Sequence, residues 1–171
     1  MRHQALYRNL PHLFLRAREE VLYHFRPILK HHGLTEQQWR ILRVLGERKE
    51  LEQWEVAGIC QILSPSLAGV LARMENQGII CRSRMPEDQR RVIVRLSAKG
   101  ARLYADIVPL VQAQYEKLEQ ALGQELIDEL YQAVDKLLAQ PHPPVEHIDL
   151  PKRPSTRGKR GVARTHTPDG V

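Results

Sequence analysis

Apolar residues recur every three or four positions along most of this chain, a spacing that places them on one face of a helix. The first run, from Leu10 to Ile28, predicts one long amphipathic helix that continues to about residue 32, before Gly33. Thr35 and Gln38 then have the spacing of a capping box, in which each side chain binds the other residue's backbone N–H. A second helix is therefore predicted here, and its apolar stripe consists of Trp39, Leu42 and Leu45.

Two shorter helices are predicted next, on either side of a turn. The first covers about residues 51–62. In the second, Ser64 is expected to cap the helix N-terminus and Pro65 to take the first helical position, where no backbone N–H is needed. This helix is expected to run to about Asn76, and its inner stripe consists of Leu67, Val70, Leu71 and Met74.

After Gly78 the apolar period changes from helical to two. Residues 79–84 are predicted to form one strand and residues 91–96 its returning partner, joined by a charged turn. In the second strand one face carries Val92, Val94 and Leu96, and the other carries Ile93 and Arg95. The pattern therefore predicts a β-hairpin, followed at Ser97 by a favourable helix N-cap.

The rest of the chain consists of a helical part and a polar tail. Residues 97–138 predict two helical segments separated near Gly123, with a kink or an early end at Pro109. Residues 141–171 hold six of the eleven prolines, few apolar residues, and six lysines and arginines against three carboxylates. This composition is typical of a disordered basic tail, so we expect a folded domain over residues 1–140 and a tail over 141–171.

The net charge of +6 and the pI near 9.6 favour a polyanionic partner. Residues 73–95 carry six arginines against three carboxylates, whereas residues 116–136 carry six carboxylates against two lysines, so only the first region suits an anion. Cys60 and Cys81 lie far apart in the sequence and are expected to be free and buried. No apolar run has transmembrane length and no signal peptide is visible, so a cytoplasmic location is expected.

The order of elements predicts a mainly α fold with a small β-hairpin, namely a winged helix-turn-helix. We expect a DNA-binding lobe over about residues 50–96, with dimerisation helices over about 6–32 and 97–139. The second helix of such a pair enters the DNA major groove, where small side chains allow close approach and Arg73 can bind a phosphate or a guanine edge. An ordinary exposed helix face is the alternative. The predicted DNA-facing residues of this helix are Ser64, Ser66, Ala68, Gly69, Ala72 and Arg73.

The hairpin tip supplies the second predicted DNA contact. It places Arg90, next to Arg91, where a wing reaches the minor groove, whose negative potential attracts arginine. Asp88 is expected to hold the guanidinium of Arg90 in place. The alternative is a surface ion pair that contributes little to stability.

These segments resemble the MarR family of transcriptional regulators. The run DQRRVIVRLSAKG, from Asp88 to Gly100, resembles the family's wing signature D-x-R-x-V-x-V-x-L-[ST]-x-x-G. GLTEQQWRIL resembles the opening of its second helix, and LSPSLAGVLARMENQGII resembles its recognition helix with the strand that follows. The similarity covers about residues 10–138 and leaves the tail without a counterpart.

A narrower resemblance, to the regulators of the homoprotocatechuate (aromatic acid) degradation operon, is carried by AREEVLYHFRPILKHHGLTEQQWR, ILSPSLAGVLARMENQGI and PEDQRR. It implies a homodimer that binds a palindromic operator in double-stranded DNA, normally as a repressor, and that an aromatic carboxylate releases. A dimer is also expected because helices at both chain ends carry more apolar surface than a small winged unit can cover.

An aromatic acid needs an apolar slot and a cation for its carboxylate. The resemblance implies a pocket between the dimerisation helices and the DNA-binding lobe, where Arg16, Arg18, His24 and Trp39 are expected to meet. The alternative is that the arginines form ion pairs with neighbouring glutamates and that the histidine is a surface or packing residue.

No catalytic, cofactor or metal site is predicted from the sequence. His31 and His32 are adjacent and point apart on a helix, and no phosphate-binding glycine loop or GxSxG motif is present. A rival hypothesis is a helical dimerisation or adaptor module whose basic hairpin binds an acidic protein partner. DNA affinity that falls steeply with salt and keeps a sequence preference would distinguish a regulator from such an adaptor.

Overall fold

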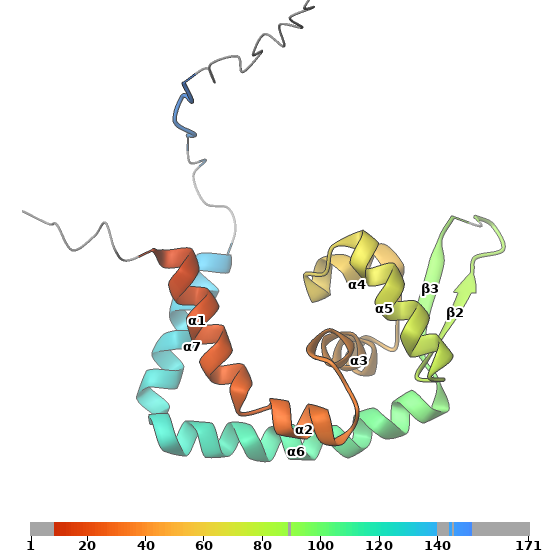
Figure 1. The fold of residues 1–171 in the computed structure, drawn as a ribbon, viewed down its shortest axis with the longest axis horizontal. Coiled ribbons are helices and arrows are strands. Elements are labelled where there is room, and N and C mark those ends of the chain that lie inside the picture. Colours follow the sequence, from red (N-terminus) through yellow and green to blue (C-terminus); the bar gives the residue numbers. More distant parts are fainter. Residues whose placement is uncertain (1–8, 89, 140–143, 145, 152–171) are drawn as a thin grey trace, which may run out of the picture. The chain divides into compact units, whose positions relative to one another are not determined.

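The computed structural model describes residues 9–88, 90–139, 144 and 146–151. It confirms a mainly helical fold with one small antiparallel sheet (Figure 1). The elements, in chain order, are α1 (Leu10–Tyr23), α2 (Arg26–His31), α3 (Glu36–Arg48), β1 (Glu50–Glu52), α4 (Gln53–Cys60), α5 (Ser64–Asn76), β2 (Ile80–Arg84), β3 (Val92–Leu96), α6 (Ala98–Leu122) and α7 (Gln124–Leu138).

The first helix is broken, so the prediction of one helix up to residue 32 is wrong. α1 ends at Tyr23 and α2 begins at Arg26, with Pro27 in its first turn. A proline ring inside a continuous helix would clash with the carbonyl four residues earlier, here that of Tyr23. The backbone N–H groups of His24 and Phe25 instead bind carbonyls three residues back, which tightens the turn between the two helices.

Of two helix N-termini predicted from capping residues, one is confirmed and one is wrong. The capping box of α3 is confirmed: the Gln38 backbone N–H donates to Thr35 Oγ1 at 3.2 Å, and the Thr35 N–H donates to Gln38 Oε1 at 2.9 Å. The predicted cap of α5 is wrong, because Leu63 holds the N-cap position and Ser64 is the first helical residue. Pro65 therefore stands one position further into the first turn than expected.

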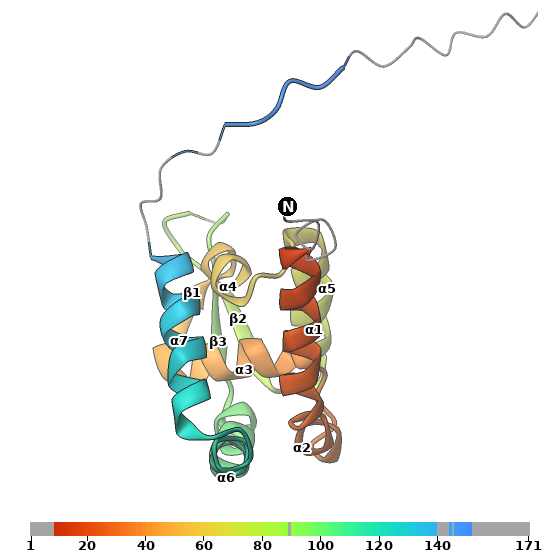
Figure 2. The same ribbon diagram turned by 90° about the vertical axis from the view of Figure 1, so that its left-hand side faces the viewer.

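The predicted hairpin is confirmed, but the sheet has a third strand that the sequence analysis assigned to a helix. The strand order is β1-β3-β2, with both pairings antiparallel. Leu51 faces Val94 across the β1–β3 pair, and both side chains are buried. Glu50 faces Arg95 in the same pair, so opposite charges meet at the exposed positions. Figure 2 shows the strands beside α3.

The long helix α6 runs through Pro109 without ending, so the expected early end is wrong there. Pro109 is exposed, whereas Ile107, Val111 and Leu118 are buried and hold the helix against the rest of the fold. α6 ends at Gly123, whose φ of 84° is disfavoured for residues with a side chain. The predicted break near Gly123 is therefore confirmed.

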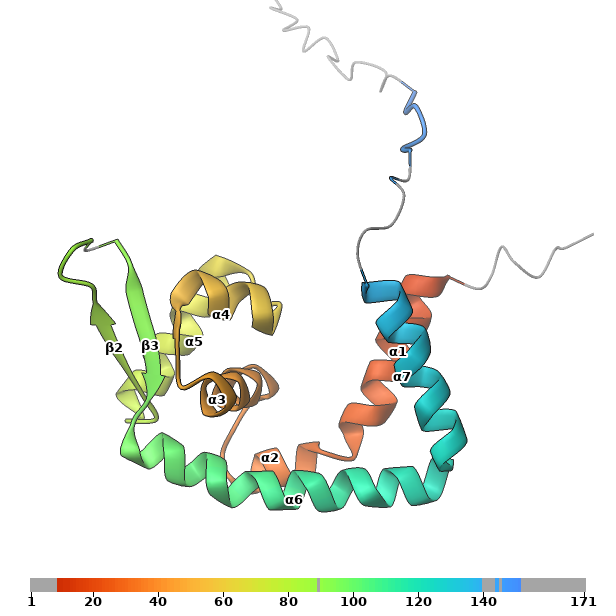
Figure 3. The ribbon, with the colours of Figure 1, turned by 180° about the vertical axis from the view of Figure 1, so that it is seen from behind.

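The core lies between α3, the helix pair α4–α5 and the sheet. Figure 3 shows α4 and α5 on one side of α3, and α6 running beside α2 and α3. Packing against α3 fixes the position of α5, because α5 buries its apolar stripe there. The most deeply buried core side chains are Ile41, Leu42, Leu45, Val56, Leu67, Val70, Leu71, Met74, Ile80, Val94 and Ile107.

The chain divides into two compact units, and the boundary follows Tyr131 within α7. The first unit contains all the elements that form the core and the sites below. Most of the predicted tail, 141–171, lies outside the described residues. Over the described part of the chain, no single helix has both the length and the hydropathy to cross a membrane; α4 and α5 meet that test only together, as a pair bent by 110°.

An ion pair joins the recognition helix to the hairpin. Glu75, near the C-terminus of α5, accepts hydrogen bonds from the backbone N–H of Arg82 at 3.3 Å and from Arg82 Nε at 2.9 Å. The Arg82 guanidinium lowers the pKa of the Glu75 carboxyl. A carboxyl with a lowered pKa stabilises the fold above its unfolded-state pKa, and this contribution is lost as pH falls through the folded-state pKa.

Glu75→Gln is therefore expected to lower the free energy of unfolding at pH 7 by up to about 1 kcal/mol, the usual limit for an exposed pair. The difference from the wild type should shrink as the pH falls to about 4 and below, near the ordinary pKa of a glutamate. Urea unfolding at pH 7, 5 and 4 measures it, with Glu116→Gln on the exposed side of α6 as control. A difference that stays constant over this pH range would contradict the assignment.

Candidate functional site

The recognition helix α5 has one buried and one solvent-facing side, as the sequence predicts. Its inner stripe of Leu67, Val70, Leu71 and Met74 is at most 1% exposed. The outer side consists of the exposed residues Ser64, Ser66, Ala68 and Arg73, with Gly69 and Ala72 partly buried. Small side chains therefore cover most of the surface that would approach DNA.

Arg73 lies close against the outer side of α5. A Cβ built on Gly69 would stand 3.6 Å from Arg73 Nη1, so the guanidinium lies beside the position one turn earlier in the helix. Arg73 also lines a hollow that contains Arg40 of α3. Its side chain is thus placed between the DNA-facing side of α5 and that hollow.

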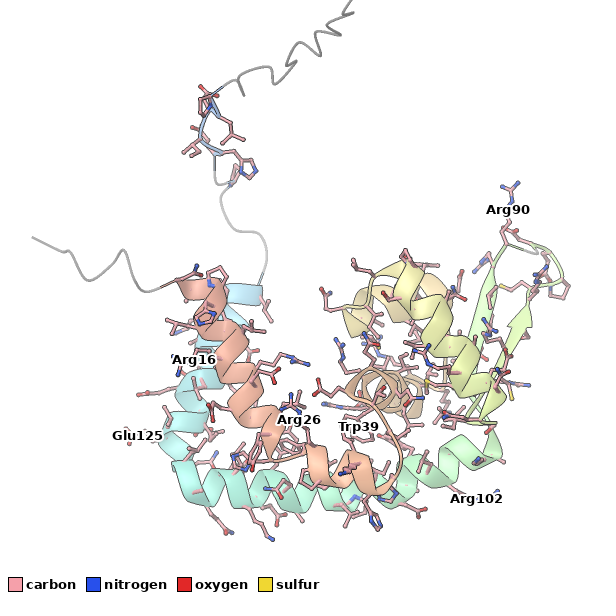
Figure 4. The ribbon with its side chains drawn as sticks, viewed as in Figure 1. Arg16, Arg26, Trp39, Arg90, Arg102 and Glu125 are labelled. Atoms are coloured by element: carbon pink, nitrogen blue, oxygen red, sulfur yellow. The ribbon has the colours of Figure 1, made fainter. Side chains whose placement is uncertain are left out.

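The wing tip carries Arg90, which projects from the turn between β2 and β3 (Figure 4). Asp88 does not hold its guanidinium, and that prediction is wrong. Asp88 Oδ1 instead accepts from the backbone N–H of Arg90 at 2.9 Å, and the Asp88 carbonyl accepts from the N–H of Arg91 at 3.0 Å. Asp88 therefore orders the turn, and the Arg90 side chain is left exposed.

Arg91 has a different environment from Arg90. Its guanidinium binds both carboxylate oxygens of Glu52, and Nε lies 3.1 Å from each. The Trp54 indole N–H donates to Glu52 Oε2 at 3.0 Å. The Arg91 guanidinium lowers the pKa of the Glu52 carboxyl. Because Glu52 lies at the junction of β1 and α4, this pair attaches the base of the wing to the helix-turn-helix.

We expect Arg90→Ala to weaken operator binding by about 1–3 kcal/mol, the usual value of a good groove contact, while the fold is unchanged. Fluorescence anisotropy with an operator duplex at moderate salt measures the loss. Arg102→Ala is the matched control, because Arg102 is an exposed arginine on α6, away from the wing (Figure 4). Equal affinity of Arg90→Ala and the wild type would refute the assignment of the wing.

A pocket of 270 Å³ lies between α3 and α6, and we call it the Trp39 pocket. The rings of Trp39 and Tyr104 are stacked, with centroids 6.5 Å apart. Tyr104 packs so closely on α3 that a Cβ at Gly46 would lie 2.6 Å from its ring, so any larger residue there would have to displace this ring. The pocket is lined by Trp39, Arg43, Glu47, Tyr104, Val108, Val111, Gln112 and Tyr115.

The Trp39 pocket combines aromatic and aliphatic walls with one cation. Arg43 Nε donates to Glu47 Oε1 at 2.9 Å, which raises the pKa of the Arg43 guanidinium. Burial raises the pKa of the Tyr115 hydroxyl, whose ring contacts Phe25 at a centroid distance of 4.6 Å. A neutral phenol and a permanent cation therefore face an apolar slot, an arrangement that suits an aromatic carboxylate.

A second, wider hollow of 1210 Å³ lies between α2, α3 and α5, and we call it the cationic hollow. At its edge, Arg18 and Arg26 each bind both Glu19 and Glu36, so four side chains form a closed ring of ion pairs. The two arginines lower the pKa of Glu36 against the opposing effect of its burial. The ionisable residues that line this hollow are Arg18, His24, Arg26, Lys30, Glu36, Arg40 and Arg73.

The four residues expected to meet at a ligand site are separated in the structure. Arg18 and His24 line the cationic hollow, and Trp39 lines the Trp39 pocket. Arg16 is exposed on α1 and lines neither of the two (Figure 4). Within this chain these side chains therefore do not cluster: Trp39 packs with Tyr104 and Tyr115 of α6, whereas Arg18 pairs with Glu36 at the edge of the cationic hollow.

Arg43 and Tyr115 line the pocket with Trp39 but were not among the residues predicted from the sequence. Arg43 is four residues after Trp39, a spacing that places both on one face of a helix, so a signal was present. Tyr115 is more than 70 residues away in the sequence and gave no local signal. In the described ranges, no three His, Cys, Asp or Glu side chains gather as a metal site would require. Both cysteines are free, but Cys81 is exposed, which corrects the expectation that it is buried.

Comparison with known proteins agrees with this geometry. A model of the MarR family matches residues 34–92, from the α2–α3 turn to the start of β3. The HTH-type transcriptional regulator FarR of Neisseria gonorrhoeae is 41% identical over 111 residues, which are 65% of this chain and 76% of FarR. This chain belongs to the MarR family. Proteins of this family, and the relatives found, are transcriptional regulators, so the fold and the family resemblance are both confirmed.

Two further relatives of this MarR-family chain have named ligands or operons. The homoprotocatechuate degradative operon repressor of Escherichia coli is 37% identical over 125 residues, covering 73% of this chain and 84% of the repressor. The crystal structure of NadR in complex with 4-hydroxyphenylacetate is 40% identical, with a TM-score of 0.63, and covers 72% of this chain and 88% of NadR. The narrower resemblance to regulators of aromatic-acid degradation is thereby supported.

Proposed function

We propose that this MarR-family regulator is a dimeric repressor of an aromatic-acid catabolic operon and leaves its operator when an aromatic carboxylate such as homoprotocatechuate binds. The observation that carries the proposal is the Trp39 pocket, in which aromatic walls and the Arg43 cation face one apolar slot. Two relatives, named for homoprotocatechuate degradation and for a 4-hydroxyphenylacetate complex, support the same class of ligand.

We propose that the Arg43 guanidinium binds the carboxylate of the ligand. Glu47 occupies only its Nε, so both terminal nitrogens of the guanidinium remain available for a bidentate contact. Arg18, in contrast, already binds Glu19 and Glu36. A carboxylate would have to displace one of these glutamates to reach it. Trp39 is therefore proposed to contact the ligand together with Arg43. Arg16, Arg18 and His24 lie outside the Trp39 pocket and are alternative ligand contacts.

The position of the Trp39 pocket explains how a ligand can act on DNA binding. One side of α3 forms this pocket with α6, and the other side packs against α4 and α5. Gly46 brings Tyr104 of α6 into direct contact with α3. A ligand that separates α3 from α6 must therefore shift the helix that supports α5. The recognition helices of a dimer must reach successive major grooves about 34 Å apart, so such a shift lowers operator affinity.

The dimer is expected to form through the terminal helices. α1 has no buried residue, although it carries Leu13, Phe14 and Val21. α7 has a single buried residue, Ile127, and its exposed apolar side chains are Leu126, Leu130, Tyr131, Val134, Leu137 and Leu138. Exposed apolar faces of this extent are typical of surfaces that a partner subunit covers.

The DNA contacts proposed are Ser64, Ser66, Ala68, Gly69 and Arg73 on α5 and Arg90 at the wing tip. Arg91 and Asp88 are proposed to act by holding the wing in place, because their polar groups bind Glu52 and the turn backbone. The protein acts by binding DNA and not by catalysis, and the cytoplasm, where bacterial DNA lies, is its proposed location.

The rival hypothesis is an adaptor that binds an acidic protein through the basic hairpin. Only a regulator should prefer its operator over a scrambled duplex at every salt concentration. The logarithm of its association constant for DNA should also fall linearly with the logarithm of the salt concentration. The family of this chain favours the regulator.

We expect 3,4-dihydroxyphenylacetate or a close aromatic acid to lower the operator affinity of the wild type through a coupling of about 1–3 kcal/mol. Arg43→Gln should bind operator normally and respond poorly, because the carboxylate loses its cation. Trp39→Ala should respond poorly because the apolar wall is lost. Titration of the operator complex with the acid measures all three proteins.

Arg18→Gln is the matched control for this experiment, since it removes a cation from the cationic hollow and leaves the Trp39 pocket intact. If the acid still releases operator from Arg43→Gln but not from Arg18→Gln, the ligand binds in the cationic hollow and not in the Trp39 pocket. If no aromatic acid weakens the wild-type complex at millimolar concentration, the proposed effector class is wrong.

Leu130→Glu in α7 is expected to convert the dimer into monomers, because it buries a charge in the proposed interface. Sedimentation equilibrium at micromolar protein tests this, with Glu129→Gln as the control on the same helix. Retention of the dimer by Leu130→Glu would exclude this part of α7 from the interface.

A further inference from the structure

The cationic hollow is not used by the proposed effector, and its chemistry differs from that of the Trp39 pocket. It receives side chains from α1, α2, α3, α5 and α6, and from His24 between α1 and α2. Figure 4 shows Arg26 between α1 and α3, and Arg26 is one of the residues that line this hollow. Five of its lining residues are permanent cations, and Glu36 is the one carboxylate among its described lining residues.

The ring of ion pairs at the edge of the hollow is electrically neutral. Arg18 and Arg26 supply two positive charges, and Glu19 and Glu36 supply two negative charges. Each carboxylate in this ring already accepts from both arginines. The ring therefore leaves no negative charge to balance the other cations of the hollow.

Three cations remain without a counter-charge. Over the part of the chain that the structure describes, no carboxylate lies within ion-pair distance of Lys30, Arg40 or Arg73. Arg40 Nη1 donates to the neutral carbonyl oxygen of Cys60 at 2.5 Å, and its buried Nε has no hydrogen-bond partner among the described residues. Like charges that share one hollow repel each other, and a bound anion converts this repulsion into attraction.

We propose that the cationic hollow is a second ligand site, for a small polyanion with at least two negative charges, and that its occupant competes with DNA for Arg73. Phosphorylated metabolites and polycarboxylates share the required chemistry. Leu29 and Pro27 supply an apolar wall beside the cations, so the hollow combines apolar surface with charged groups, as ligand sites do. The second half of the proposal rests on the proposed role of Arg73 in DNA binding; the binding of the polyanion does not.

Arg73 gives the site its regulatory effect. Its guanidinium lies beside Gly69 on the outer side of α5 and also borders the hollow. A polyanion held by Lys30 and Arg40 attracts this guanidinium into the hollow and away from a DNA phosphate or base. By linkage, operator DNA must then weaken polyanion binding by the same factor.

Calorimetric titration of the full chain, without DNA and at constant ionic strength, tests the site. Pyrophosphate and citrate are the two probes, and acetate is the monovalent control. We expect Lys30→Gln and Arg40→Gln each to weaken binding at least fivefold, and Arg102→Gln, on α6 outside the hollow, to leave it unchanged. Because Arg40 also binds the Cys60 carbonyl, Lys30→Gln keeps the test valid if Arg40→Gln fails to fold. Binding of only one probe assigns the ligand to phosphates or to polycarboxylates.

Two results would overturn the proposal. One is that neither probe binds more tightly than acetate at matched ionic strength. The other is that Lys30→Gln binds the better probe as tightly as the wild type. Operator competition completes the test: the polyanion should displace operator from the wild type and at least fivefold less effectively from Lys30→Gln.

Failure of this proposal is distinguishable from failure of the proposed function. Arg43→Gln and Trp39→Ala, which alter the Trp39 pocket, should bind the polyanion as the wild type does. Loss of polyanion binding in these variants would show that the two pockets are one site and would contradict the assignment of two ligands.

Discussion

The packing of α3 is the constraint on which the rest of the molecule depends. Ile41, Leu42 and Leu45 are at most 1% exposed and form the centre of the core shared with α4, α5 and the sheet. On another side, α3 meets α6 at Gly46, where a side chain would displace the Tyr104 ring. α3 is therefore fixed to the DNA-binding lobe by its apolar stripe, and to the long helix α6 by Tyr104, which packs on Gly46 and stacks on Trp39.

This arrangement places two chemically different spaces on the flanks of α3. Trp39 and Arg43 open toward α6, where the walls are aromatic and aliphatic, while Arg40 opens toward α2 and α5, where the walls are cationic. A ligand on either flank acts on the same helix, and through it on α5. The charge of the ligand, more than its size, decides which flank it occupies, since an aromatic monoacid needs one cation and a polyanion needs several.

Local sequence signals predicted much of the fold, and the errors have physical causes. The capping box at Thr35, the helix end at Gly123 and the hairpin are short-range features, and all three are present. β1 is three residues long and exists only because β3, about 40 residues later, pairs with it. The break after Tyr23 follows from Pro27. The prediction of one continuous helix relied on the apolar periodicity of the segment and gave this proline too little weight.

The candidate sites were less predictable than the fold, because their partners come from distant segments. The outer side of α5 follows from its helical periodicity, and the exposure of Arg90 follows from its place in the predicted turn between two strands. The binding of Arg91 to Glu52 and of Arg18 to Glu36 depends on how strands and helices pack, and no spacing in the sequence shows it. The same holds for Tyr115, which completes the Trp39 pocket from α6.

The central claim is that an aromatic acid binds between α3 and α6 and there controls DNA binding. A crystal structure of the protein with bound 3,4-dihydroxyphenylacetate tests it most directly. We predict that the ring lies between Trp39 and Tyr115 and that the carboxylate binds the terminal nitrogens of Arg43. An acid found beside Arg18 in the cationic hollow, with the Trp39 pocket empty, would contradict the claim.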